Sequence, residues 1–344
     1  MDVRVHMSNI KQAKIDIAVL ILFFCRDEQF GKVFEAVRKA RPSRLYLYQD
    51  GRRPGRTDDL EGILRCREIA GDENIDWECE VHRNYQEKNY GCDPSEYLAQ
   101  KWMFETEEMG IVLEDDDVPA QSFFPFCKEL LEKYKDDTRI NMICGMNNLQ
   151  TVDWCPYSYL FSTSGSITGW ASWKRVIDMW ESKIPNLDDP YYLSTYQNRY
   201  KELYDAEKSL MHYRQCNASG IEYYEAILGA NALSNSMLNI VPTQNQISNI
   251  GVAGNATHSV SSLKMMPKGI RRIFFMPTYE LEFPLRHPPY VMEDVRFKKE
   301  LDKVMGRGFF RKRYRKLESI CLRLYYGDFK GLWRSLKRRF EKRK

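Results

Sequence analysis

Ile15-Asp-Ile-Ala-Val-Leu-Ile-Leu-Phe-Phe24 is the stretch that decides the fold. Its nearly unbroken run of Ile, Val, Leu and Phe is typical of a parallel strand that is buried on both faces. At about ten residues the run is too short to span a bilayer. It also does not indicate a signal peptide, because Asp16 interrupts it and the charged Arg26-Asp-Glu28 follows without a small-residue cleavage site.

Strands and helices are predicted to alternate downstream of this first strand. Apolar runs indicate strands at 44–49, 76–82, 110–113 and 140–144, and helical periodicity indicates helices at 29–40, 58–70, 93–107 and 123–134. Ser122 is a candidate cap for the last of these helices. This alternation predicts an α/β fold with a mostly parallel, Rossmann-like central sheet covered on both faces.

The second half of the chain is less regular. A helix is predicted near 170–180, polar helices between 189 and 215, and a strand at 238–241. We predict two domains, with residues 12–265 forming the sheet-based domain. Residues 266–344 form a C-terminal extension with basic amphipathic helices.

The charge of the chain is divided unevenly. The formal net charge is +4, but residues 296–344 hold 19 Lys/Arg and 5 Asp/Glu, which leaves 33 and 43 for the rest. The tail is therefore +14 and the body −10. A basic tail of this kind indicates an anionic partner, either a membrane surface or a nucleic acid.

The tail also carries two apolar stripes at helical spacing. The first comprises Phe310, Tyr314, Leu317, Cys321 and Leu324, and the second Phe329, Leu332, Trp333, Leu336 and Phe340. Amphipathic basic helices favour peripheral attachment to an anionic membrane. A helical cap folded onto the acidic body is an alternative, and a nucleic-acid arm is disfavoured by the stripes.

The nine cysteines show no C-x-x-C pair, and their odd number at irregular spacings is typical of a reducing compartment. A hydrophobic content of 43% excludes wholesale disorder. We therefore expect a cytoplasmic protein, peripheral at the inner face of the cell membrane through its tail.

Four consecutive carboxylates, Glu114-Asp-Asp-Asp117, follow directly after the predicted strand at 110–113. Neighbouring carboxylates repel, and a cation or shared protons relieve the repulsion. The carboxyl ends of strands face the ligand crevice in open α/β sheets, and hard oxygen ligands suit Mg²⁺ or Mn²⁺. A solvated turn is the alternative interpretation, with helix capping as the simplest role for Asp117.

Ile111-Val-Leu-Glu-Asp-Asp-Asp117 followed by Ser122-Phe-Phe124 resembles the acidic (DxD-type) motif of inverting GT-A glycosyltransferases. The sequence is most similar to the N-acetylglucosaminyltransferase I branch and to bacterial sugar transferases of polysaccharide loci. Segments that agree in order include Asn89-Tyr-Gly-Cys92, Gly169-Trp-Ala-Ser-Trp173 and the closing segment at 238–258. The resemblance covers about residues 15 to 260 and implies transfer from a nucleotide-sugar donor, with a UDP-sugar as the leading expectation.

The resemblance implies roles for the acidic run. Asp116 corresponds to the direct ligand of Mn²⁺ or Mg²⁺, and Glu114 and Asp115 to residues that hold the ribose and sugar hydroxyls of the donor or metal-bound water. His258 corresponds to a further metal or diphosphate contact, although a surface or capping His is the plainer alternative.

The resemblance also assigns the rest of the donor site. Cys25, Arg26 and Asp50 stand where the family contacts the nucleotide base. Gly169 and Trp170 belong to a loop that lies against the donor and acceptor sugars. Ordinary core packing is the alternative for Trp170.

An inverting transfer needs one general base on the acceptor hydroxyl. The related enzymes place an Asp in a Trp-Asp-type motif, whereas this chain has Ile221-Glu-Tyr-Tyr-Glu225. Glu222 is the first candidate and Glu225 the second, with a surface helical Glu as the alternative for each. The acceptor is expected to be a saccharide or a lipid-linked saccharide, and no nucleic acid partner is expected.

Two other functions compete with this one. A sugar nucleotidyltransferase shares the sheet and the divalent ion, but it needs a Gly-rich basic loop after the first strand, which Cys25-Arg-Asp-Glu-Gln29 does not provide. A non-catalytic membrane-peripheral protein is the third possibility, with the acidic run serving only as a turn.

Overall fold

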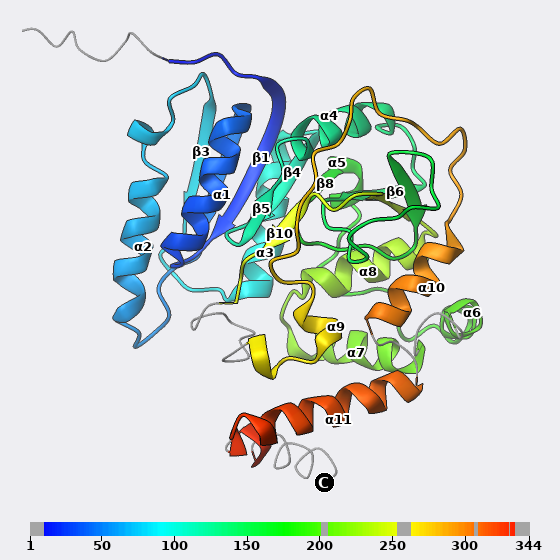
Figure 1. The fold of residues 1–344 in the computed structure, drawn as a ribbon. Helices are drawn as coiled ribbons and strands as arrows, with labels where there is room; N and C mark the ends of the chain where they lie inside the picture. The colour runs from blue at the N-terminus through cyan, green and yellow to red at the C-terminus, as the bar shows by residue number, and fades with distance from the viewer. Residues whose placement is uncertain (1–9, 201–205, 253–262, 306–308, 330, 334–344) are drawn as a thin grey trace, which may run out of the picture.

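The computed structural model describes residues 10–200, 206–252, 263–305, 309–329 and 331–333 (Figure 1). Its centre is an eight-stranded sheet in the order β3-β2-β1-β4-β8-β6-β9-β7. Six strands point in one direction, while β8 and β7 run antiparallel to their neighbours. The prediction of a mostly parallel central sheet is confirmed. The strands of this sheet are β1 (Ile15–Phe23), β2 (Pro42–Gln49), β3 (Glu80–Tyr85), β4 (Met109–Glu114), β6 (Ile140–Cys144), β7 (Tyr159–Ser162), β8 (Trp170–Trp173) and β9 (Leu238–Pro242).

Helices cover both faces of the sheet. The helices of the first half are α1 (Asp27–Ala40), α2 (Asp58–Ile69), α3 (Cys92–Thr106), α4 (Phe123–Lys133) and α5 (Lys174–Ile177), with a 3-10 turn η1 (Asp72–Asn74). Those of the second half are α6 (Pro190–Tyr200), α7 (Ala206–Ser219), α8 (Tyr224–Ser234), α9 (Lys268–Arg271), α10 (Val295–Val304) and α11 (Phe309–Tyr325), with a 3-10 turn η2 (Leu263–Met265).

The first strand is buried on both faces, as its sequence predicted. Ile17, Val19 and Ile21 pack into a core that α1 and α4 cover, whereas Leu20 and Leu22 pack into a second core with α3 and α8. Each fully buried aliphatic side chain contributes about 1.5–3 kcal/mol. The buried side chains of β1 therefore help to hold the helices on both faces against the sheet.

A small second sheet lies over the end of the first. Its strands are β5 (Asp117–Pro119) and β10 (Ile247–Asn249), which pair antiparallel with Asn249 opposite Asp117. The chain segment after β9 is thereby hydrogen-bonded to the acidic run. The closing segment predicted at 238–258 therefore contacts the acidic run through β10. The prediction for His258 lies outside the described residues.

Three predictions about the elements are wrong. Trp170–Trp173 is a strand inserted between β4 and β6, where all four residues are buried, and only the single turn α5 follows it. The third strand begins at Glu80, because Trp77 is buried with its indole bonded to the Pro42 carbonyl. Ser122 makes no capping bond, since its hydroxyl donates to Gln246 Oε1.

The segment after residue 265 returns to the body. Leu285 belongs to the first core, and Phe297 and Leu301 of α10 to the second. The Tyr279 amide donates to the Asn245 carbonyl, and the Asp294 amide to the Phe161 carbonyl. Residues between 266 and 305 therefore pack into the same hydrophobic cores as the residues before the predicted domain boundary at 265. Among the described helices, none is long and apolar enough to cross a membrane.

Gly169 lets β8 pass under the second sheet. Its φ is +59°, and a Cβ at this position would lie 2.6 Å from Ile247 Cδ1. Its amide donates to Asp117 Oδ2 at 2.8 Å. The glycine is therefore required by the backbone and by the close approach of β10.

We predict that Gly169→Ala lowers the free energy of unfolding by about 2–4 kcal/mol, because left-handed strain and a steric clash add together. Gly55→Ala is the matched control, since Gly55 has φ +74° and a Cβ there would meet nothing within 4 Å. The control loses only about 1–2 kcal/mol from strain. Urea denaturation measures the free energy of unfolding of both variants. Equal decreases for the two would contradict the steric role given to Ile247.

Candidate active site

A cavity of about 460 Å³ opens at the carboxyl ends of β1, β2 and β4. The chain leaves β1 for β2 on one side and β4 pairs with β1 on the other, so the strand order reverses at this point. In open α/β sheets ligands bind in the crevice outside such a reversal. The cavity lies where the topology places a ligand site.

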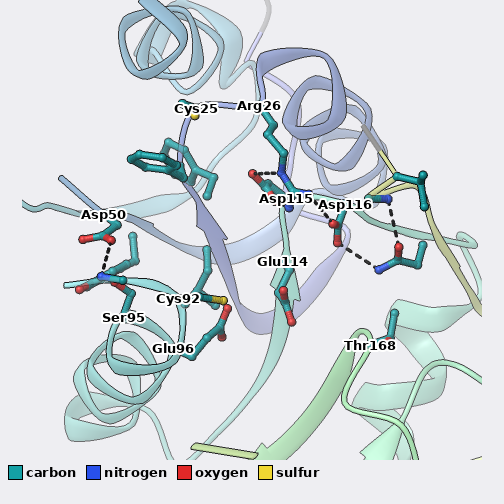
Figure 2. A pocket seen from close by; sticks show the side chains of 18 of the residues that line it. Cys25, Arg26, Asp50, Cys92, Ser95, Glu96, Glu114, Asp115, Asp116 and Thr168 are labelled. Carbon is teal, nitrogen blue, oxygen red and sulfur yellow. Dashed lines mark hydrogen bonds and ion pairs between the residues drawn. The ribbon is translucent and has the colours of Figure 1, made fainter. Parts of the chain in front are cut away.

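Arg26 joins this cavity to the acidic run. It follows β1 closely in the chain, and its guanidinium pairs with Asp115, and with Asp116 through Nη1 to Oδ2 at 2.8 Å (Figure 2). Burial alone would lower the pKa of Arg26, but the charges of Asp115 and Asp116 outweigh it and raise the pKa. Arg26 therefore stays charged and occupies the acidic run, rather than the base position that the sequence predicted.

Arg26 pairs with two of the five carboxyl groups that β4, the residues after it and α3 bring to this part of the protein. Glu114, Asp115 and Asp116 line the cavity from the end of β4, Glu96 lines it from α3, and Asp117 is buried behind them. Figure 2 shows Glu96 beside Cys92, with Glu114 facing the same space. The alternative interpretation of the acidic run as a solvated turn does not fit the structure, because Asp115, Asp116 and Asp117 are only 4%, 7% and 1% exposed.

Burial disfavours the charged form of these groups. It raises the pKa of Glu96, Glu114 and Asp117 well above the usual range, and the neighbouring carboxylates raise it further. The pKa of Asp116 is also raised by burial, although Arg26 opposes the shift. The site therefore either holds protons or needs another cation.

Asp117 does not cap a helix. Its Oδ2 accepts from the Gly169 amide at 2.8 Å and the Glu114 amide at 3.3 Å, while Asn249 donates to Oδ1 at 3.3 Å. Asn249 also donates to Asp116 Oδ1 at 3.2 Å, and a Cβ on Gly251 would meet Asp116 Oδ2 at 2.0 Å. These contacts hold Asp116 in one orientation at the cavity edge.

Asp50 lines the cavity but its oxygens are already occupied. Oδ1 accepts from the amides of Gly51 and Tyr90, and Oδ2 from the Gly91 amide and the Asn89 side chain, at 2.8–3.0 Å. A carboxylate has about four lone-pair sites. Asp50 therefore fixes the 89–91 turn that begins α3, and the base contact predicted for it is not available.

The two candidates for the general base are now separated. Glu225 lines the cavity from the first turn of α8. Glu222 is not among the lining residues and lies near Tyr97, whose pKa is raised by burial and by the Glu222 charge. The structure favours Glu225, the second choice from the sequence.

Two residues predicted to contact sugars do not line the cavity. Trp170 is 1% exposed and stacks on Trp180 at 6.3 Å between ring centroids, so its ring presents no free face. Gly169 is covered by Ile247, and its neighbour Thr168 lines the cavity instead. Trp170 is a core residue because β8 is a central strand.

Cys25 lines the cavity, and burial raises the pKa of its thiol to about 11. It is therefore a neutral, apolar wall at neutral pH. Its contact with a nucleotide base stays a prediction. Phe24 and Arg53 stand beside it, with the guanidinium 5.4 Å from the ring centroid. This end of the cavity offers a flat aromatic and cationic surface.

Sequence reasoning missed Glu96, Ser95, Tyr48 and Asn249. A signal for Glu96 existed, because it shares a helical face with the buried Ala99 and Met103, where a carboxyl is unexpected. The buried hydroxyls of Tyr48 and Ser95 make no well-formed hydrogen bond among the described residues. Asn249 could not be found, since only the β5–β10 pairing brings it to Asp116.

Carboxylates of the acidic run are the type of ligand that hard divalent ions prefer. Within the described ranges, however, no group of three or more His, Cys, Asp or Glu side chains is arranged so that it could hold a metal ion. Mg²⁺ is usually bound through one or two carboxylates plus substrate phosphates and water. Asp115 and Asp116 are two carboxylates at the cavity edge, and both pair with Arg26 in this structure.

Comparison with known proteins gives no family. No family model and no curated protein matches the chain. Among solved structures, apo UDP-glucose pyrophosphorylase is similar at 8% identity and a TM-score of 0.36, covering 70% of this chain and 93% of that one. The complex of UDP-glucose pyrophosphorylase with UDP-glucose has 8% identity and a TM-score of 0.35, with 68% and 92% covered.

The glycosyltransferase GlyE of Streptococcus pneumoniae TIGR4 is similar at 8% identity and a TM-score of 0.26, covering 58% of this chain and 43% of that one. All three TM-scores describe a loose likeness of fold. They assign no activity to this chain.

We predict that the free energy of unfolding falls as pH rises from about 4.5 through neutrality. The folded carboxyls have raised pKa values, so the native state binds more protons than the unfolded chain in this window, and stability is lost as they leave. Glu96→Gln should raise stability at pH 7.5 by about 1–3 kcal/mol and flatten the slope. Gln100 can still donate to the new amide oxygen, as it does to Glu96 at 3.1 Å.

Glu61→Gln is the control for this measurement, because the Glu61 side chain is 76% exposed and paired only with Arg65 on the same helix. It should change stability by less than about 0.5 kcal/mol at either pH. A Glu96→Gln protein as pH-sensitive as the parent would show that the buried carboxyls do not carry the linkage.

Proposed function

We propose that this chain is a metal-dependent glycosyltransferase that uses a nucleoside-diphosphate sugar, with a UDP-sugar as the leading donor. The observation that carries the proposal is the buried acidic end of β4, held with Arg26 at the strand-order reversal. A cavity of this size accommodates a nucleotide sugar. The proposed transferase would act in the synthesis of a glycoconjugate or a surface polysaccharide.

Asp116, supported by Asp115, would hold Mn²⁺ or Mg²⁺ together with the donor diphosphate. A divalent ion bound there would neutralise the negative charge that develops on the leaving nucleoside diphosphate. Arg26 places a second positive charge at the same point and needs no proton transfer to do so. Glu114 and Glu96 face the space where a sugar would lie and offer oxygens to its hydroxyl groups.

Transfer with inversion needs a base on the far side of the donor. We assign this role to Glu225, which would take the proton of the acceptor hydroxyl as its oxygen bonds to the anomeric carbon and the bond to the diphosphate breaks. The acceptor is proposed to be a saccharide or a lipid-linked saccharide.

The first competing function is a sugar nucleotidyltransferase. That reaction needs a phosphate-binding loop for a nucleoside triphosphate. Here only Phe24, Cys25 and Arg26 separate β1 from α1, and none of the three is a glycine. The short connection therefore favours a diphosphate donor over a triphosphate substrate.

The second competing function is a non-catalytic peripheral protein. It requires the acidic run to be an ordinary exposed turn, whereas Asp115, Asp116 and Asp117 are buried beside a cavity. Burying carboxylates without a ligand is unfavourable. This arrangement favours a binding site.

We predict that UDP binds at least tenfold more tightly with Mn²⁺ than with EDTA, and that Asp116→Asn removes the difference. Asp136→Asn is the control, because Asp136 is exposed beyond α4 and should leave binding unchanged. Titration calorimetry with UDP, GDP and dTDP measures the effect and ranks the carriers. Metal-independent binding by the parent would remove the metal from the proposal.

The base assignment is tested by two neighbouring variants. Glu225→Gln should reduce the slow hydrolysis of the nucleotide sugar by about 10²–10⁴-fold, since the attacking water, which takes the place of the acceptor hydroxyl in this assay, loses its proton acceptor. Glu222→Gln should remain within a few-fold of the parent. Calorimetry should show donor binding unchanged in both, and the reverse order of effects would restore Glu222 as the base.

A further inference from the structure

The apolar stripe of α11 points away from the protein. Tyr314, Leu317, Cys321 and Leu324 recur at helical spacing and are all exposed, with Tyr314 at 70%, Leu317 at 61% and Leu324 at 50%. A surface helix ordinarily turns its apolar stripe toward the core. Since the stripe faces outward here, the described structure does not match a helical cap seated on the body through its apolar face.

The opposite side of α11 holds the helix in place. The Lys268 amide donates to Glu318 Oε1 at 2.9 Å, and Arg315 Nη1 donates to the Met305 carbonyl at 3.1 Å. Figure 1 shows α11 along one edge of the molecule, next to α9. The polar side of the helix is therefore used for docking, and the apolar side is presented as an outer surface.

The charge of α11 complements an anionic surface. Its 17 residues, FFRKRYRKLESICLRLY, contain six Arg or Lys and one Glu. Aromatic side chains continue the outer surface beyond the helix, with Phe329 at 66% and Trp333 at 71% exposure. Basic residues around an exposed Leu and aromatic stripe fit the headgroup region of an anionic leaflet. A nucleic acid would match the charge but not the Leu side chains.

The surface also borders the cavity. α11 contacts η2, and the segment that follows supplies Met266, Ile273 and Phe274 to the cavity lining. Lys268, whose amide donates to Glu318 of α11, stands between Met266 and Ile273 in the sequence. A leaflet against the outer face of α11 would therefore lie across the width of this helix, about 10 Å, from the side of the cavity formed by residues 263–274.

We propose that the outer face of α11 docks on an anionic membrane leaflet and places the 263–274 side of the cavity beside it, so that a lipid-linked acceptor reaches the site from the membrane. The lipid-linked acceptor rests on the proposed transferase function. The docking of α11 does not.

Flotation of the full chain tests the docking, with vesicles of phosphatidylglycerol and phosphatidylcholine against vesicles of phosphatidylcholine alone. We expect the parent to float with the anionic vesicles in about 0.1 M salt, where charges are screened beyond roughly 10 Å. Tyr314→Ser/Leu317→Ser/Leu324→Ser should reduce the bound fraction at least tenfold. Tyr191→Ser/Met211→Ser is the matched control, because these side chains on α6 and α7 are 80% and 54% exposed, and it should float like the parent.

Amide hydrogen exchange of the native chain with the same vesicles tests the orientation. Protection should appear in 313–329 and 263–274 and be absent from α2. Flotation of the triple variant equal to that of the parent overturns the proposal, as does protection confined to other segments. Migration of the parent with RNA, without flotation, would identify a nucleic-acid surface instead.

Calorimetry with UDP and Mn²⁺ in the absence of vesicles separates this proposal from the transferase proposal. The triple variant should bind UDP like the parent. Flotation without any nucleotide binding would leave the docking surface standing and refute the transferase.

Discussion

The crowding of carboxyl groups at the end of β4 is the constraint on which the site depends. Glu114, Asp115, Asp116 and Asp117 are placed there by the strand, Glu96 arrives from α3, and Arg26 is the cation that pairs with Asp115 and Asp116. Charges of one sign are costly to bury together. The fold offsets this cost with the Arg26 pairs, with backbone amides on Asp117 and with raised pKa values.

This electrostatic imbalance links the fold to the proposed chemistry. In the proposed function, a divalent ion would offset the carboxyl charge that Arg26 does not pair with, and a donor diphosphate would supply further oxygens to that ion. Asp116 keeps one orientation in this site, because Asn249 and Gly251 enclose it from the β10 side. The buried carboxyl groups at the end of β4 and the contacts that orient Asp116 are the observations on which the proposed metal site rests.

Much of the sheet could be predicted from the sequence, since burial on both faces gives β1 and β4 unmistakable apolar runs. The insertion of β8 could not, because Trp170-Ala-Ser-Trp173 lies within a stretch whose spacing also fits a helix, and only β4 and β6 decide between them. Arg26 and Asp50, the residues predicted to contact the nucleotide base, both line the cavity. Their roles differ from prediction because neighbours such as Asp115 and the Tyr90 amide, which periodicity does not reveal, already occupy their polar atoms.

The proposed transferase activity is tested most directly by incubating the chain with a panel of nucleotide sugars and Mn²⁺ and following the products by phosphorus and proton nuclear magnetic resonance. We expect slow release of a nucleoside diphosphate and free sugar from one UDP-sugar, with the sugar first appearing in the anomeric form opposite to that of the donor. Release of sugar 1-phosphate on addition of pyrophosphate, or no turnover of any donor, would contradict the proposed activity.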